Sequence, residues 1–234
     1  MVKPRVSIVI PALDEEAAIG GVVASVRERV ARVIVADNGS TDATAEVARA
    51  AGAEVVRVPR AGYGRACLAG IERAGDSDIV VFMDGDASDD PDDLEALLAP
   101  ILSGEAVFTV GSRLRGDAER GALTLPQRFG NRLACTLMRV IWGSRFTDLG
   151  PFRAIRREAL EDLRMRAPTY GWTVEMQVRA LKAGLTYREV PVRYRRRIGT
   201  SKISGTVRGM MLAGWYILST IAREALPGGS GWQG

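Results

Sequence analysis

The chain has 234 residues, 47% of them hydrophobic, and a net charge of +4. This length and composition exclude a largely disordered chain and predict one large domain, with or without a small appendage. The sequence contains no histidine, which excludes imidazole as a general base or metal ligand and, with it, the Ser-His-Asp triad. Any metal must therefore be held mainly by oxygen atoms, which favours Mg²⁺ or Mn²⁺.

The charge is unevenly distributed along the chain. Residues 1–110 carry 10 basic and 19 acidic side chains, and the remainder carries 22 and 9. An acidic first part suits a metal-binding floor, and a basic second part suits an anionic partner such as a phosphate, a nucleic acid or a lipid surface. Surface arginines that serve only solubility are an equally good explanation of the basic part.

The cysteine content and the hydropathy pattern indicate a compartment. Cys67 and Cys135 are the only cysteines, too few for a disulfide framework, so we expect free thiols in a reducing setting. The first residues show no signal-peptide pattern, and the apolar segment Met210–Ala222 is well short of a membrane span. The sequence therefore predicts a cytoplasmic protein.

Strands and helices alternate through the first hundred residues. Short apolar runs predict strands at Val6–Ile10, Val33–Ala36, Glu54–Val58 and Ile79–Met83. Helical spacing follows at Ala17–Arg29, in a segment through Ala51, and at Arg65–Ala74. This alternation predicts right-handed βαβ units and a mainly parallel sheet.

The apolar run 79–83 stops at two carboxylates, Asp84 and Asp86. In an extended chain, residues i and i+2 point to the same side, so both carboxylates can face one ligand, and Gly85 lets that ligand approach the backbone. Ligands of parallel sheets bind at the carboxyl ends of the strands, which predicts that the turns 11–15, 37–42, 60–64 and 84–86 converge. A divalent cation carrying phosphates fits this arrangement. The simpler alternative, a solvated acidic loop that caps the next helix, is the better interpretation of residues 89–93.

The second half of the chain departs from the strand–helix alternation. It contains a predicted strand at Ala106–Val110, a long Gly- and Arg-rich loop at Leu114–Gln127, a helix at Arg128–Trp142, a late strand at Val190–Tyr194 and a basic loop at Arg195–Lys202. A last helix is expected at Thr206–Arg223, and Pro227–Gly234 has the composition of a disordered tail. Both late helices can pack on the core or lie on a lipid surface.

Several turns match the motifs of one enzyme family, in order. They are Ile8–Glu15, Asp37–Asp42, Asp84–Asp86, Gly111–Arg113, Thr147–Arg153, Tyr170–Glu175, Val190–Val192 and Arg196–Lys202. With these motifs the chain resembles the inverting family 2 glycosyltransferases of the GT-A fold, and within them the dolichol-phosphate mannose synthase and polyprenyl-phosphate glycosyltransferase branch. Each motif is weak alone, but their order from Val6 to Lys202 makes the resemblance specific.

The resemblance implies a fold and an activity. The fold would be a mainly parallel, Rossmann-like sheet flanked by helices, with residues 1–205 as the catalytic domain and 206–234 as an amphipathic helix and flexible tail. The activity would be transfer of a hexose from a nucleotide sugar of the UDP-glucose or GDP-mannose type, with Mg²⁺ or Mn²⁺. The implied acceptor is polyprenyl phosphate, which would place the protein on the cytoplasmic membrane face, and no nucleic-acid partner is expected.

The resemblance also implies roles for individual residues. Those that would bind the nucleotide sugar are Pro11, Leu13, Glu15, Asp37, Gly64, Asp84, Gly85 and Asp86, and the metal would lie on Asp84 and Asp86. Those nearest the reaction would be Asp148, Glu175, Arg113, Arg153, Arg196 and Lys202. A hydroxyl acceptor needs a general base, for which Asp148 and Glu175 are the candidates, whereas a phosphate acceptor is already ionised and depends on the basic side chains.

Other functions remain open at the level of sequence. The turn Gly62–Cys67 suggests a dinucleotide-binding dehydrogenase but lacks the third glycine of that fingerprint. A nucleotidyltransferase would need a Gly-rich basic loop after the first strand, which is absent from the sequence. A glycosyltransferase with a soluble hydroxyl acceptor and a non-catalytic nucleotide-binding module are the remaining alternatives.

Overall fold

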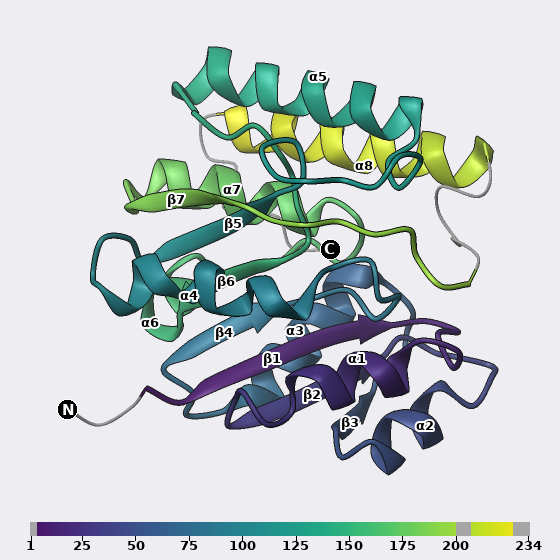
Figure 1. Ribbon diagram of the computed structural model, residues 1–234. Helices are drawn as coiled ribbons and strands as arrows, with labels where there is room; N and C mark the ends of the chain where they lie inside the picture. Colours follow the sequence, from purple (N-terminus) through teal and green to yellow (C-terminus); the bar gives the residue numbers. More distant parts are fainter. Residues whose placement is uncertain (1–3, 200–206, 227–234) are drawn as a thin grey trace.

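The structure is a computed structural model that describes residues 4–199 and 207–226 (Figure 1). Its centre is a seven-stranded sheet in the order β3-β2-β1-β4-β6-β5-β7. The strands are β1 (Val6–Ala12), β2 (Arg32–Asp37), β3 (Glu54–Arg57), β4 (Ile79–Phe82), β5 (Phe108–Ser112), β6 (Arg153–Arg156) and β7 (Tyr187–Pro191). β6 runs antiparallel to β4 and β5, and the other described strand pairings are parallel. The predicted α/β fold with a mainly parallel sheet is confirmed.

Helices cover both faces of this sheet. They are α1 (Ile19–Val26), α2 (Thr44–Ala50), α3 (Tyr63–Ala74), α4 (Leu94–Leu102), α5 (Leu125–Trp142), α6 (Arg157–Asp162), α7 (Trp172–Lys182) and α8 (Val207–Ala225), with a 3₁₀ turn at Pro91–Asp93. Along β1, Ile8 and Ile10 pack with α1 and α4, whereas Val9 packs on the other face with α3. Because both faces are covered, β1 and β4 are buried at every position, which is why β4 is a continuous apolar run and β1 is interrupted only by the small Ser7.

Two late strands differ from their predictions, and one strand was missed. β5 and β7 are displaced by two and three residues from the predicted Ala106–Val110 and Val190–Tyr194. After β7 the chain leaves the sheet, and Tyr194 makes only isolated bridges to Asp89 and Ala118. β6 was not predicted because two arginines in its four residues obscure the apolar pattern of a central strand.

The two long late helices lie side by side along one edge of the molecule (Figure 1). α5 begins at Leu125, three residues before its predicted start, because Thr124 and Gln127 form a capping box. α8 packs against both α5 and α7. No helix in the described ranges is long and apolar enough to cross a membrane. The proposed boundary at residue 205, Lys202 and the tail 227–234 lie outside the described residues, so the division into 1–205 and 206–234 stays a prediction.

Candidate active site

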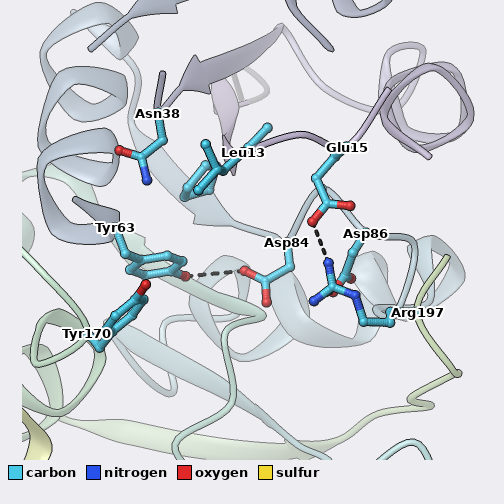
Figure 2. Close-up of a pocket in the computed structure, with 11 residues that line it drawn as sticks. Leu13, Glu15, Asn38, Tyr63, Asp84, Asp86, Tyr170 and Arg197 are labelled. Atoms are coloured by element: carbon cyan, nitrogen blue, oxygen red, sulfur yellow. Dashed lines mark hydrogen bonds and ion pairs between the residues drawn. The ribbon is translucent and has the colours of Figure 1, made fainter. Parts of the chain in front are cut away.

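A pocket opens at the carboxyl ends of β1, β2 and β4 (Figure 2). It is lined by six residues that the sequence had assigned to the nucleotide-sugar site, namely Pro11, Leu13, Glu15, Asp84, Gly85 and Asp86. The remaining lining residues are Ala12, Asn38, Tyr63, Tyr170 and Arg197. The predicted turns therefore converge as expected of a parallel sheet.

The turns after β1 and β2 are tied together by hydrogen bonds. Asp14 adopts a left-handed conformation with φ of 51°, and its carboxylate accepts from the N–H of Thr41 at 2.8 Å. The N–H of Glu15 donates to Thr44 Oγ1 at 2.8 Å. Left-handed backbone at a non-glycine residue costs about 1 kcal/mol and is kept only where surrounding contacts enforce it. These contacts fix the point from which the Glu15 side chain enters the pocket.

The carboxylate of Asp86 is held in place by its own loop. Its Oδ1 accepts from the N–H and the hydroxyl of Ser88, at 3.0 Å and 2.5 Å. Ala87, between Asp86 and Ser88, has φ of 62° and is the second left-handed non-glycine residue at this edge of the sheet. Such strain is found where a loop must aim a side chain. The second oxygen of Asp86 remains directed to the pocket, where it meets Arg197.

Asp84 has polar partners on two sides. Its carboxylate accepts from the Tyr63 hydroxyl at 3.3 Å, and its N–H donates to Asp89 Oδ2 at 3.1 Å. Burial, together with the nearby Asp86 carboxylate, raises the pKa of Asp84 to about 7. Burial and the Asp84 charge also hold the pKa of Asp89 well above its usual range. The site therefore has an excess of carboxylates over cations.

This donor set fits a hard divalent cation. Among the described residues no cluster of three or more His, Cys, Asp or Glu side chains forms a metal site. Asp84 and Asp86 supply two carboxylates, and Mg²⁺ is commonly bound by one or two carboxylates while substrate phosphates and water complete its shell. The residues present therefore suit a cation that arrives with a diphosphate.

The acidic stretch after Asp86 is only partly the solvated cap that was predicted. Asp90 caps the next helix by accepting from the N–H of Asp92 at 3.1 Å, which confirms the capping role. Asp89 and Asp90, however, are only 2% and 1% exposed, so the prediction that they are solvated is wrong. Asp89 is buried because it holds the backbone of Asp84, a contact that sequence spacing does not reveal.

The raised pKa of Asp84 predicts how stability depends on pH. The carboxyl ionises near 3.8 in the unfolded chain and near pH 7 when folded, so the metal-free protein should lose stability as pH rises across that interval. We expect Asp84→Asn, in chelator, to melt higher than wild type at about pH 8 and to show a flatter pH dependence. Scanning fluorimetry measures both, with the exposed Asp92→Asn as control. A lower melting temperature for Asp84→Asn at that pH would contradict this expectation.

Two glycines of the predicted site lie in close contact with neighbouring parts of the chain. A Cβ on Gly85 would lie 3.3 Å from Ile10 and Ile19, so this glycine faces the core as well as lining the pocket. Gly64 does not line the pocket, and a Cβ there would lie 1.9 Å from the carbonyl oxygen of Ala167. Gly64 thus permits close contact between α3 and the 167–168 segment.

Replacing Gly64 should therefore cost stability. We expect Gly64→Ala to lower the free energy of unfolding by about 2–3 kcal/mol, because the backbone of Ala167 must move. The control is Gly21→Ala at an exposed position of α1, where nothing lies within 4 Å of the added Cβ and a gain of about 0.5–1 kcal/mol is expected. Urea unfolding measures both variants, and equal effects would contradict the packing role of Gly64.

The basic loop after β7 contributes Arg197 and not the predicted Arg196. Arg197 forms ion pairs with Glu15 and Asp86 in the pocket. Arg196 points elsewhere and donates from its guanidinium to the carbonyl of Arg120 at 2.7 Å. In an extended segment neighbouring side chains point to opposite sides, so an error of one residue moves the predicted group out of the site.

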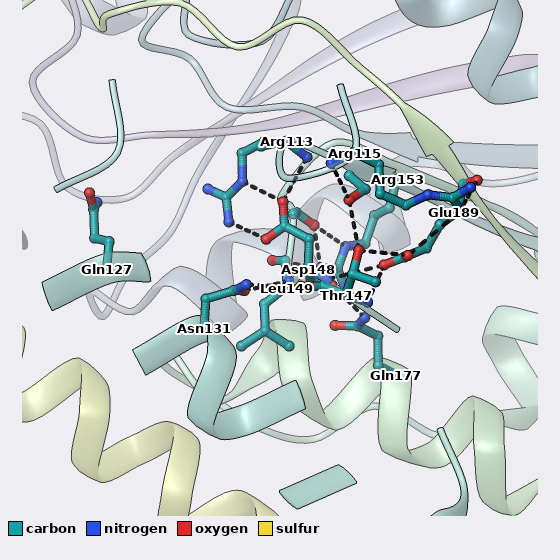
Figure 3. Close-up of polar contacts among 12 residues, drawn as sticks. Arg113, Arg115, Gln127, Asn131, Thr147, Asp148, Leu149, Arg153, Gln177 and Glu189 are labelled. Carbon is teal, nitrogen blue, oxygen red and sulfur yellow. Dashed lines mark hydrogen bonds and ion pairs between the residues drawn. The ribbon is translucent and has the colours of Figure 1, made fainter. Parts of the chain in front are cut away.

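A second polar cluster surrounds Asp148 (Figure 3). Asp148 is 1% exposed, and Arg113 binds both of its carboxylate oxygens, with Nε at 2.9 Å and Nη2 at 2.7 Å. The N–H of Arg113 also donates to Asp148 at 2.7 Å. Although burial alone would lower it, pairing with Asp148 raises the pKa of Arg113. The guanidinium lies 5.1 Å from the ring centre of Tyr194.

The other two buried residues of the predicted reaction centre are occupied by structural contacts. Glu175 is fully buried, accepts from the N–H groups of Arg166 and Ala167, and pairs with Arg179 at 2.9 Å. Arg153 donates to backbone carbonyl oxygens, including Gly150 at 3.0 Å and Thr173 at 2.8 Å. Burial lowers the pKa of Arg153 to about 10. Neither side chain lines the pocket.

In the turn after β2, one residue stabilises the turn and its neighbour lines the pocket. Asp37 is buried, and its carboxylate accepts from the N–H of Ser40 at 2.9 Å. Its neighbour Asn38 lines the pocket and accepts from the N–H of Gly62 at 2.6 Å. Asp37 thus shapes the turn, while Asn38 connects it to the segment that leads into α3.

Comparison with known proteins places this arrangement in a family. The pattern of Glycosyl transferase family 2 matches residues 7–164, well over half of the chain. The chain belongs to this family. As a family 2 member it is a glycosyltransferase, and this confirms the resemblance on which the predicted activity rested.

Curated relatives match over nearly the whole chain. It is 37% identical over 229 residues to an uncharacterised glycosyltransferase of Mycobacterium tuberculosis (strain ATCC 25618 / H37Rv), covering 94% of this chain and 100% of the relative. It is 34% identical over 227 residues to the dolichyl-phosphate hexose transferase of Haloferax volcanii, covering 94% and 95%.

A solved structure extends the comparison to the fold. Glucosyl-3-phosphoglycerate synthase from Mycobacterium tuberculosis, in complex with Mn²⁺, uridine diphosphate and glucosyl-3-phosphoglycerate, superposes with a TM-score of 0.76 and 27% identity. The similarity covers 95% of this chain and 80% of that protein. The predicted GT-A fold of this family 2 glycosyltransferase is thereby confirmed.

Proposed function

We propose that this glycosyltransferase transfers a hexose, with inversion, from a UDP- or GDP-sugar to polyprenyl phosphate at the cytoplasmic membrane face. Mg²⁺ or Mn²⁺ would be held by Asp84 and Asp86. The pocket at the strand ends, the dolichyl-phosphate hexose transferase among its relatives and the UDP and Mn²⁺ of its structural neighbour support this proposal.

The donor would lie along the pocket, from the turn after β1 to the Asp84–Asp86 loop. Pro11, Leu13 and Asn38 offer apolar and amide surface for a nucleobase, and Glu15 can accept from ribose hydroxyls. When bound, a divalent cation supplies charge that stabilises the departing nucleoside diphosphate. Tyr63, whose hydroxyl donates to Asp84, also lines this pocket.

The proposed choice of acceptor rests on the burial of Asp148 and its pairing with Arg113. A general base must reach the proton that it removes, but both oxygens of Asp148 are engaged by Arg113 and the side chain is almost fully buried. Glu175, the other candidate base, is likewise enclosed. A phosphate acceptor needs no base, because it is already ionised. The structure thus favours an acceptor that attacks through a phosphate oxygen.

The surface of α5 and α8 supports a lipid as the carrier of that phosphate. Both helices expose large apolar side chains, which are Leu125, Phe129, Val140, Ile141, Met211, Leu212, Trp215, Tyr216 and Leu218. α5 also exposes Arg128, Arg132 and Arg139 and contains no acidic residue. Apolar side chains interspersed with arginines are typical of helices that lie at the surface of an anionic bilayer.

This surface gives a direct prediction of membrane binding. Phe129 and Trp215 are 72% and 68% exposed, and we expect the double variant Phe129→Ser/Trp215→Ser to bind anionic vesicles about tenfold more weakly. Co-sedimentation with vesicles that contain phosphatidylglycerol measures the change. Leu102→Ser on α4, which is 54% exposed, is the matched control and should bind as wild type does. Equal binding by wild type, the double variant and Leu102→Ser would show that the exposed side chains of α5 and α8 do not contribute to membrane binding.

The proposed function is tested by assaying two donors with two alternative acceptors. The purified enzyme is incubated with labelled UDP-glucose or GDP-mannose, Mn²⁺, and either polyprenyl phosphate in detergent or 3-phosphoglycerate. Labelled lipid is the expected product, and its anomeric configuration should be opposite to that of the donor. Labelled phosphoglycerate would instead indicate a soluble hydroxyl acceptor. If no product forms with either acceptor although a nucleotide binds, a non-catalytic nucleotide-binding module is favoured.

A further inference from the structure

Arg197 occupies the part of the pocket where a cation is most needed (Figure 2). Its Nη2 lies 2.5 Å from Glu15 Oε1, and its Nη1 lies 3.2 Å from Asp86 Oδ2. Asp86 is one of the two proposed metal ligands, and its other oxygen is already engaged by Ser88. In the free protein Arg197 therefore balances the charge that a divalent cation would balance in the loaded enzyme.

The backbone on both sides of Arg197 is fixed to the loop that carries Asp86. The N–H of Arg195 donates to the carbonyl oxygen of Ser88 at 2.8 Å, and the N–H of Ile198 donates to that of Asp86 at 2.9 Å. Just before this segment, Tyr194 bridges to Asp89. Release of Asp86 therefore requires only that the Arg197 side chain rotate, and no part of the backbone need unfold.

The guanidinium of Arg197 also has an unused donor. Its Nε is buried and has no hydrogen-bond partner within the described part of the chain. A buried donor without an acceptor costs about 1–3 kcal/mol, so this geometry indicates an acceptor that is present only in the loaded site. Guanidinium groups match phosphate oxygens well, which makes a diphosphate the fitting acceptor.

On the basis of the donor site proposed above, we propose that Arg197 competes with the metal for Asp86 and turns to the diphosphate when both bind. A metal alone would have to displace Arg197 and leave its charge with only Glu15. A diphosphate alone would meet the carboxylates of Asp84 and Asp86. When both ligands bind, the metal pairs with Asp84 and Asp86, and the diphosphate pairs with the metal and with Arg197, so each ligand should strengthen the binding of the other by the same factor.

The test measures metal binding without requiring turnover. Mn²⁺ affinity is determined by electron paramagnetic resonance, alone and with inorganic pyrophosphate, UDP or GDP. Arg197→Gln is expected to bind Mn²⁺ alone about tenfold more tightly than wild type, while the gain in Mn²⁺ affinity on adding the diphosphate falls by at least that factor. Arg197→Met, which also removes the charge, should behave in the same way.

A matched control and two contrary outcomes make the test decisive. Arg195→Gln, two positions earlier, removes a guanidinium that pairs with Asp90 outside the pocket, and should leave Mn²⁺ binding unchanged. If wild type binds Mn²⁺ with a nucleotide but neither neutral variant binds Mn²⁺ alone more tightly, the competition is refuted and the donor site stands. If wild type binds no combination of Mn²⁺ and nucleotide, the donor site itself is refuted.

Discussion

Asp86→Asn is expected to lower kcat/KM for sugar transfer by about a thousandfold, the size of effect seen when a preorganised group that stabilises transition-state charge is lost. Asparagine preserves the shape of the side chain and can still accept from Ser88, so the loop should keep its conformation. It cannot supply a negative oxygen to a divalent cation, and its pairing with Arg197 is weakened. The loss should therefore fall on the metal-dependent part of the reaction.

Initial rates over a range of Mn²⁺ concentrations measure this prediction. Asp92→Asn is the control, since its exposed carboxylate lies a few residues further on and pairs with Arg29. The control should retain wild-type rates, because an exposed ion pair contributes little. An Asp86→Asn enzyme with rates within a few-fold of wild type would show that Asp86 does not hold the metal.

The second large effect is on stability. Asp148→Ala is expected to lower the free energy of unfolding by about 3–5 kcal/mol, because it leaves the Arg113 guanidinium buried without its carboxylate. A loss of this size should lower the melting temperature by roughly 10 °C in a chain of this length. The control is Asp76→Ala, which breaks an exposed ion pair between Arg5 (52% exposed) and Asp76 (70% exposed) and should leave the stability almost unchanged.

The double variant Arg113→Met/Asp148→Ala separates the unpaired charge from other losses. Replacing a buried ion pair with apolar groups is often close to neutral, so the double variant should recover a substantial part of the stability lost by Asp148→Ala. Urea unfolding measures both. If the double variant loses as much stability as Arg113→Met and Asp148→Ala lose in total, Asp148 and Arg113 do not act as a pair.

The same contact changes how activity at Asp148 should be interpreted. From sequence, a complete loss of transfer by an alanine variant would have indicated a general base and a hydroxyl acceptor. Because the pair with Arg113 is buried, the variant can lose activity simply by unfolding. Transfer to polyprenyl phosphate must therefore be measured well below the melting temperature of the variant, where a modest loss supports a phosphate acceptor.

The part of the site that could be predicted from sequence is the part carried by strand ends. Asp84 and Asp86 follow an apolar run that is buried on both faces, and such runs in alternation with helices define a parallel sheet and its functional edge. The position of Glu15 and Leu13 after β1 follows from the same rule. Local pattern is sufficient there because the topology brings consecutive strand ends together.

The residues that could not be predicted depend on contacts between distant segments. Asp148 and Arg113 are 35 positions apart, and nothing in either motif shows that they pair. Glu175 occurs in a motif of the family, yet its carboxylate is enclosed by Arg166, Ala167 and Arg179. Burial of charged groups is settled by tertiary packing, which sequence periodicity does not encode.

Calorimetric titration of the wild-type protein with UDP and with GDP, each in Mn²⁺ and in chelator, tests whether Asp84 and Asp86 form a metal-dependent donor site. We expect one nucleotide to bind with micromolar affinity when metal is present and at least tenfold more weakly in chelator, because without the metal the diphosphate meets the carboxylates of Asp84 and Asp86 while Arg197 is still paired with Asp86. Equal affinity with and without metal, or no binding of either nucleotide, would contradict a metal-dependent donor site at Asp84 and Asp86.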